Sequence, residues 1–262
     1  AYELAKDNAL SFLHINKPEV DMPDEVSVYD PSVYAKGREN LERFISEGTL
    51  KQDDTATLYV YKQVMGDHQQ IGLVAAASVE AYDQDLIKKH EFTRPVKEDD
   101  RVHHMDALDA QVGPVFLTYK AQASIDALIA KVIKDAPDYD FEADDATQHV
   151  FWVIRDEELV AAVEGEVNAL DCLYVADGHH RIVISKVNNQ LHKFFPCIPV
   201  LDPCLSVLSY EHVIEFIWHS TCRRKHEVLT TYLVISNIRH GQQCIEFGHN
   251  SDNFLHDLGS WC

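Results

Sequence analysis

Five consecutive residues carry the densest chemistry in the sequence: Asp177, Gly178, His179, His180 and Arg181, directly after a short apolar run. A strand that ends in a glycine turn and continues as a helix offers backbone N–H groups that favour anions. Arg181 adds a guanidinium that can donate two hydrogen bonds to one phosphate, and the histidines can donate to phosphate or transfer a proton. Asp177 can hold a metal ion or orient a histidine. The pattern is typical of a phosphate site, and also of a strand end with a capping aspartate and surface histidines.

A second group of acid, base and hydroxyl side chains lies between residues 87 and 101. His90 and Glu91 are adjacent in it, and Thr93 and Arg94 follow closely. A carboxylate beside a histidine and near a cation can act as a general base. The same composition is typical of a solvated, salt-bridged loop or helix, so this segment by itself predicts no activity.

Strand and helix patterns surround both groups and must position them. Apolar runs predict strands at 58–61, 71–75, 115–119, 149–154, 173–176 and 194–201, and the first two form a hairpin. Apolar residues at helical spacing predict helices at 3–12, 41–45, 125–133 and 156–167. The acidic segment 135–145 is interpreted as a solvated loop, because the spacing and the glycine of a calcium loop are missing. The elements alternate without a strict strand–helix–strand rhythm, which predicts the α+β class (mixed α/β).

Several individual residues are assigned to structure rather than to chemistry. Trp152 is predicted to lie in the core, and Tyr59 and Tyr61 are predicted to pack on one shared face of their strand. His103 and His104 could be metal ligands, but a solvated acidic and basic segment is the favoured interpretation.

The charge balance excludes several classes of function. The 262 residues include 23 Lys+Arg and 43 Asp+Glu, which gives a formal net charge of −20. Nucleic acids and anionic membranes require a basic surface, so we expect neither as a partner. No apolar run approaches the ~18 residues of a membrane span. Six Cys without tight spacing are typical of a reducing compartment, so we expect a cytoplasmic protein.

The two chemical segments together resemble a known superfamily. The string DGHHR at 177–181 and the pattern HE-x-T at 90–93 are similar to motifs of the free serine kinases in the ParB/sulfiredoxin-like superfamily. Over residues 3–216 the chain more closely resembles an uncharacterised family of unknown function, labelled SpoOJ/ParB-like. The matching stretches are 11–14, 17–21, 58–61, 72–74, 87–93, 97–101, 114–117 and 176–181.

This resemblance implies a ParB/sulfiredoxin-like core and the chemistry of a small-molecule kinase. It implies catalytic roles for Glu91, His90 and Asp177. It implies phosphate or nucleotide binding by Gly178, His179, His180 and Arg181, and substrate binding by Thr93 and Arg94. The cofactor would be Mg²⁺, the phosphoryl donor ATP, ADP or pyrophosphate, and the hydroxyl acceptor free L-serine. The alternative is a nucleotide-binding, ParB-like regulatory protein without kinase activity.

The sequence divides into three segments. We expect an N-terminal α/β region over 1–85, a phosphate-binding core over 86–201 and an atypical segment over 202–262. Residues 203–262 hold four of the six Cys and six of the fifteen His. The closely spaced Cys pairs that structural zinc favours are missing there, so scattered thiols are the favoured interpretation. Since the family usually starts earlier and extends further, the resemblance implies a chain without its first segment or its usual C-terminal half, and possible inactivity.

Overall fold

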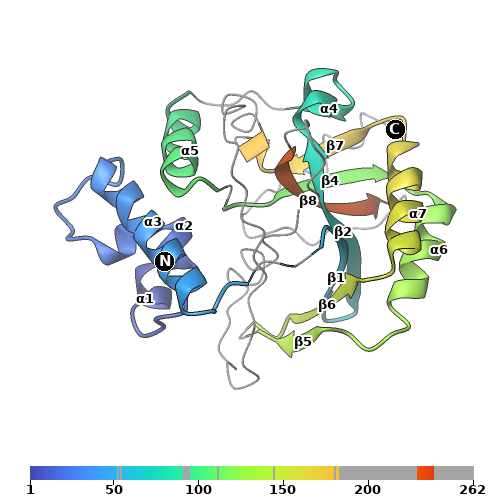
Figure 1. Ribbon diagram of the computed structural model, residues 1–262, viewed down its shortest axis with the longest axis horizontal. Coiled ribbons are helices and arrows are strands. Elements are labelled where there is room, and N and C mark those ends of the chain that lie inside the picture. Colours follow the sequence, from blue (N-terminus) through green and yellow to red (C-terminus); the bar gives the residue numbers. More distant parts are fainter. Residues whose placement is uncertain are drawn as a thin grey trace.

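The computed structural model describes residues 1–51, 53, 55–90, 95–110, 112–143, 145–179, 181–182 and 229–238. These residues form a mixed α+β structure, which confirms the predicted class. Figure 1 shows a group of N-terminal helices beside a twisted sheet. The strand predicted at 194–201 lies outside the described residues.

The N-terminal group contains α1 (Tyr2–Ala5), α2 (Leu13–Asn16), the 3-10 turn η1 (Pro18–Asp21) and α3 (Pro31–Ser46), and α5 (Pro95–Leu108) packs against α3. Asp30 caps α3, because its carboxylate accepts a hydrogen bond from the Ser32 N–H at 2.9 Å. Phe12, Phe44 and Leu108 are buried together between these helices. The predicted helix over 41–45 is therefore confirmed as part of α3.

The single helix predicted over 3–12 is wrong. Helix α1 ends at Ala5, and α2 begins only at Leu13. In the intervening segment, the side chains of Asn8 and Ser11 each accept a hydrogen bond from a backbone N–H two residues further on. Such local bonds compete with the backbone bonds of a continuous helix, so this segment turns instead.

Eight strands within the described residues form one mixed sheet, in the order β3-β7-β4-β8-β2-β1-β6-β5. Their bounds are β1 (Leu58–Met65), β2 (His68–Ser78), β3 (Ile87–Lys88), β4 (Val115–Lys120), β5 (Tyr139–Glu142), β6 (Gln148–Ile154), β7 (Leu173–Asp177) and β8 (Leu229–Ile238). Strands β1 and β2 are the predicted hairpin, closed by the pair Met65 and His68. Strand β8 runs parallel to β4 and antiparallel to β2. The segment 202–262 therefore supplies an internal strand of the sheet.

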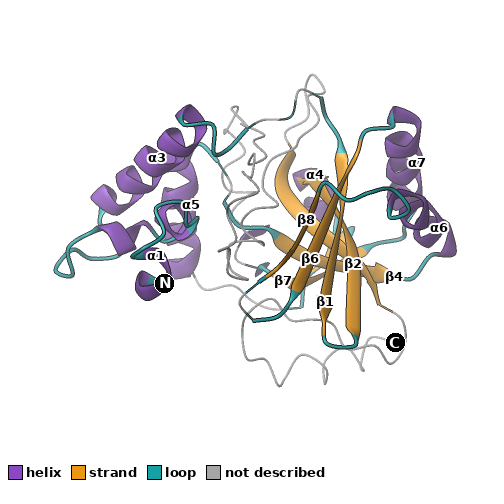
Figure 2. Cartoon of the chain, turned by 90° about the horizontal axis from the view of Figure 1, so that it is seen from below, coloured by secondary structure: helices purple, strands orange, loops and turns teal. Residues whose placement is uncertain are grey.

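Helices α6 (Ala123–Val132) and α7 (Glu157–Asn168) lie on one side of the sheet, and α1, α3 and α5 lie on the other (Figure 2). Ile125, Ile129 and Val132 of α6 are buried, as their helical spacing predicts. Asp156 caps α7 by accepting bonds from two N–H groups of the first turn. Trp152 belongs to the same core, which confirms its predicted place.

The opposite face of the sheet carries an aromatic cluster. Tyr59 and Tyr61 are buried on it beside Phe116, which confirms that the two tyrosines share a face. The Tyr61 hydroxyl lies 2.7 Å from Nδ1 of His149, and the two rings are stacked. Burial lowers the pKa of His149 to about 4, so this ring is neutral at pH 7.

Two interpretations of polar segments are wrong. The acidic segment 135–145 is not entirely a loop, because Tyr139–Glu142 pairs with β6 as the edge strand β5. His104 is not solvated, because α5 turns it toward α2, where its Nε2 donates to the Ile15 carbonyl at 2.9 Å. Its neighbour His103 is exposed. A polar sequence pattern identifies neither an edge strand nor a buried histidine, since both are stabilised by partners distant in sequence.

Candidate functional site

The two chemical segments of the sequence follow two neighbouring parallel strands. Strands β3 and β7 are paired in parallel, with Ile87 opposite Leu173 and Lys88 opposite Tyr174. The Leu173 N–H also donates to the Leu86 carbonyl at 2.8 Å. Because parallel strands end at the same edge of a sheet, the residues that follow β3 and β7 are brought to one place.

His90 and His179 meet at this edge. Their ring centroids lie 4.4 Å apart with an interplanar angle of 84°, so the edge of one ring faces the plane of the other. His179 is 7% exposed and His90 is exposed, so the contact joins a buried ring to a ring at the surface. The segment that contains HE-x-T and the DGHHR string are therefore adjacent in space, although the sequence separates them widely.

The turn after β7 has the backbone geometry that the sequence predicts. Gly178 has a φ of +91°, which a residue with a side chain rarely adopts. A Cβ at this position would lie 3.3 Å from the Cα of Val115, so β4 approaches the turn closely. The N–H groups of Arg181 and Ile182 both donate to the Gly178 carbonyl, at 2.8 and 3.1 Å, and form a helical turn. Asp177 precedes the turn and is exposed.

Arg181 folds back onto the residues that precede β4. Its Nη1 donates to the Pro114 carbonyl at 2.8 Å. A Cβ on Gly113 would lie 2.8 Å from Nε of Arg181, so the guanidinium lies directly against the Gly113 backbone. Sequence reasoning did not assign Gly113 a role. The available signal was a Gly-Pro pair immediately before a predicted strand, which is typical of a turn.

Four of the predicted site residues lie outside the described residues: Glu91, Thr93, Arg94 and His180. The described members of the prediction, His90, Asp177, Gly178, His179 and Arg181, all belong to the β3–β7 edge. In the part of the chain that the structure describes, no group of three or more His, Cys, Asp or Glu could hold a metal ion. The Cys and His residues of 203–262 fall outside that part.

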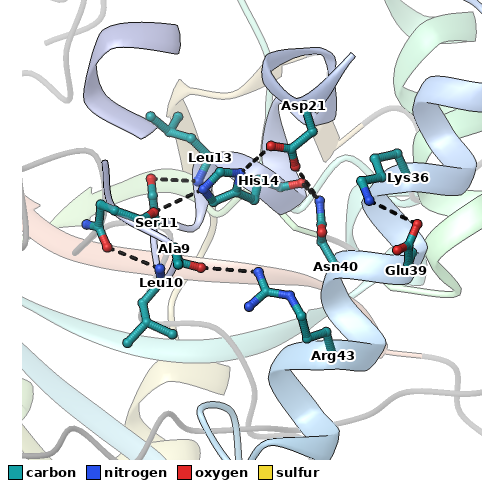
Figure 3. Close-up of polar contacts among 11 residues, drawn as sticks. Ala9, Leu10, Ser11, Leu13, His14, Asp21, Lys36, Glu39, Asn40 and Arg43 are labelled. Carbon is teal, nitrogen blue, oxygen red and sulfur yellow. Dashed lines mark hydrogen bonds and ion pairs between the residues drawn. The ribbon is translucent and has the colours of Figure 1, made fainter. Parts of the chain in front are cut away.

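Two further polar networks stabilise the N-terminal helices. Around His14, both ring nitrogens face acceptors: Nδ1 lies 2.8 Å from Asp21 and Nε2 lies 3.0 Å from the Asn8 carbonyl (Figure 3). Asn40 of α3 donates to the His14 carbonyl and to Asp21, at 2.7 and 2.8 Å. These bonds join α2 to η1, to α3 and to the loop that precedes α2, which indicates a structural role.

In the second network the Tyr34 hydroxyl donates to Asp100 of α5 at 3.0 Å, and Arg101 forms an ion pair with the same carboxylate. Burial and the Asp100 carboxylate raise the pKa of Tyr34 to about 12. This network fixes α5 to α3.

The fold and this edge define a mixed α+β protein in which histidines from two parallel strand ends meet beside a glycine turn. The model of the DUF1015 family, described as a protein of unknown function, matches residues 1–193, and the chain belongs to this family. The matched range contains every predicted site residue. No curated protein and no solved structure matches the chain. Within the described ranges, no helix combines the length and the apolar character that crossing a membrane requires.

Proposed function

We propose that this protein is a small-molecule kinase that transfers a phosphoryl group from ATP, ADP or pyrophosphate to a hydroxyl compound. The observation that carries the proposal is the contact of His90 with His179, because it joins a candidate acid–base segment to a candidate phosphate turn. Phosphoryl transfer depends mainly on positioning and on neutralising charge, and such a pairing of segments suits both tasks. The likeness of DGHHR to the free serine kinases suggests L-serine as the acceptor.

Glu91 is the general base in this proposal. It follows His90 directly, and adjacent Cα atoms lie about 3.8 Å apart. The contact of His90 with His179 therefore supports including its sequence neighbour Glu91 in the same proposed site. Glu91 would accept the proton of the attacking hydroxyl, and His90 would orient the Glu91 carboxylate. Thr93 and Arg94 would contact the acceptor.

The residues of the turn would bind the phosphates of the donor. Gly178 exposes its backbone, and His179, His180 and Arg181 supply donors of hydrogen bonds. Asp177 is an exposed carboxylate at the start of the turn. Mg²⁺ commonly takes one or two carboxylates together with substrate phosphates and waters, and a single aspartate fits that pattern. When bound, the ion would neutralise charge on the phosphate oxygens.

A nucleotide-binding regulatory protein is the second candidate function. The same turn could bind a nucleotide without transferring its phosphate, and the acceptor half of the site, with Glu91 as its general base, is the part that separates the two functions. The net charge of −20 opposes a role on DNA. A kinase requires Glu91, whereas a regulatory protein would bind nucleotide equally well without it.

The test of the kinase is product formation. The full chain is incubated with L-serine, Mg²⁺ and each donor in turn, and phosphoserine is followed by ³¹P NMR. We expect Glu91→Gln to lower turnover by about 10²–10⁴-fold while nucleotide binding is retained. Glu142→Gln is the matched control, because Glu142 is exposed on β5, at the opposite edge of the sheet. Nucleotide binding without product from any donor would favour the regulatory protein.

A separate measurement tests the phosphate turn. Arg181→Ala should weaken binding of ADP or pyrophosphate by about 10–100-fold in calorimetric titrations, because a charged donor of hydrogen bonds is lost. Arg155→Ala is the control, since Arg155 is an exposed arginine whose partner is Asp138. Equal affinity of Arg181→Ala and the unmodified chain would remove the turn from the proposal.

A further inference from the structure

The two residues before β4, Gly113 and Pro114, contact the side chain of Arg181, which the sequence did not predict. The Pro114 carbonyl accepts a hydrogen bond from Nη1 at 2.8 Å. At Gly113, an added Cβ would lie 2.8 Å from Nε, 3.0 Å from Cδ and 3.4 Å from Cζ of Arg181. Three consecutive atoms of the side chain thus run along a backbone that has no side chain of its own.

We propose that Gly113 and Pro114 are positioning residues, which fix the guanidinium of Arg181 in the orientation that binds the donor phosphates. This inference rests on the proposed function. A guanidinium donates two parallel N–H bonds to a phosphate only when its plane is oriented toward the phosphate oxygens. The bond to Pro114 uses one nitrogen and sets that plane, and the bare backbone of Gly113 allows the plane to come close.

Strand pairing holds the backbone that follows position 113 in place. Strand β4 is paired on both sides, with β7 and with β8. Two residues beyond Gly113, Val115 is fully buried, and its Cα would lie 3.3 Å from a Cβ on Gly178. Because β4 and the turn are already in close contact there, a methyl group at position 113 must displace the flexible end of Arg181 rather than the strand.

The experiment compares four forms of the full chain: unmodified, Gly113→Ala, Arg181→Ala and the double variant. Binding of ADP and of pyrophosphate is titrated in the presence of Mg²⁺. We expect Gly113→Ala to weaken binding by about 10-fold, and the double variant to bind no more weakly than Arg181→Ala. In turnover assays, Gly113→Ala should raise the KM for the donor and leave the KM for the acceptor unchanged.

Two controls separate positioning from a general loss of structure. Gly165→Ala adds the same methyl group where nothing lies within 4 Å, and it should bind as the unmodified chain does. Arg181→Lys keeps the charge but has a single donor nitrogen, so it cannot both bond Pro114 and donate to a phosphate from two separate nitrogens. We expect Arg181→Lys to lose about 10-fold in affinity. This variant tests the positioning of the guanidinium even if Gly113→Ala fails to fold.

The outcomes distinguish this inference from the proposed function. If Arg181→Ala loses affinity while Gly113→Ala and Arg181→Lys bind normally, Gly113 and Pro114 do not position Arg181, and the proposed phosphate binding by the turn is retained. If Gly113→Ala and Arg181→Ala weaken binding additively, Gly113 acts independently of Arg181, and the inference is overturned as well. If the unmodified chain binds neither ADP nor pyrophosphate, the proposed function itself fails.

Discussion

Mild acid is expected to weaken the docking of α5 through the buried ring of His104. This side chain is 3% exposed, and its Nε2 donates to the Ile15 carbonyl at 2.9 Å. Burial, and secondarily the nearby Arg101 guanidinium, lower the pKa of His104 from the ordinary 6.5 to about 3. The ring is therefore neutral in the folded protein throughout the neutral and mildly acidic range.

The direction of the effect follows from where each state binds a proton. Below pH 6.5 the unfolded chain protonates this histidine, whereas the folded chain does so only near pH 3. The contribution of His104 to stability is thus complete above pH 6.5 and is lost progressively as the pH falls toward 3. Between pH 7.5 and 5.5 the loss amounts to about 1.4 kcal/mol. This interval ends above the sequence pI of ≈5.0, near which solubility is lowest.

Urea unfolding of the unmodified chain and of His104→Gln at both pH values measures this loss. A glutamine amide can donate to the Ile15 carbonyl but does not titrate. The other ionisable groups, including the buried His149, are common to both proteins and cancel in the comparison. We expect the unmodified chain to lose about 1.4 kcal/mol more than His104→Gln over the interval. An equal loss in both proteins would refute the argument.

Four further substitutions test the fold. Gly165→Ala on the exposed side of α7, where nothing lies within 4 Å, should raise the free energy of unfolding by about 0.5–1 kcal/mol. Gly37→Ala should lower the free energy of unfolding, because a Cβ there would lie 2.7 Å from the ring of Pro18. Urea unfolding measures the sign of both changes. Asn40→Asp replaces a donor with a carboxylate facing Asp21, so we expect a loss of about 2–4 kcal/mol in thermal unfolding, and an unchanged melting temperature would contradict the role of the network. Ile235→Pro should destabilise by about 3 kcal/mol or more, because Ile235 is paired with Leu73 of β2 on one side and with Leu117 of β4 on the other; a normal urea midpoint would argue against this place for β8.

The elements that the sequence predicted correctly are those whose stability is local. The hairpin of β1 and β2 follows from two apolar runs around a glycine turn, and α6 follows from apolar residues at helical spacing. Helix α7 begins where Asp156 can cap it. The errors lie where partners are distant: β5 is a strand because β6 pairs with it, and His104 is buried because α2 covers it.

The candidate site divides in the same way. The residue types of 177–181 and of 90–94 were sufficient to propose its chemistry, because acids, bases and donors of hydrogen bonds to phosphate are recognisable without coordinates. The role of Gly113 was not predictable. A glycine before a strand has many possible causes, and only the position of Arg181 selects one of them.

The sequence alone was enough to predict the α+β class, most of the local elements and the two groups of candidate site residues, since each depends on residues within a few positions of one another. Only the tertiary structure decided that the two groups share one edge of the sheet. The parallel pairing of β3 with β7 brings His90 to His179, and the antiparallel pairing of β4 with β7 brings Val115 to the Gly178 turn. Such pairings depend on backbone hydrogen bonds between distant segments, which no local pattern of side chains specifies.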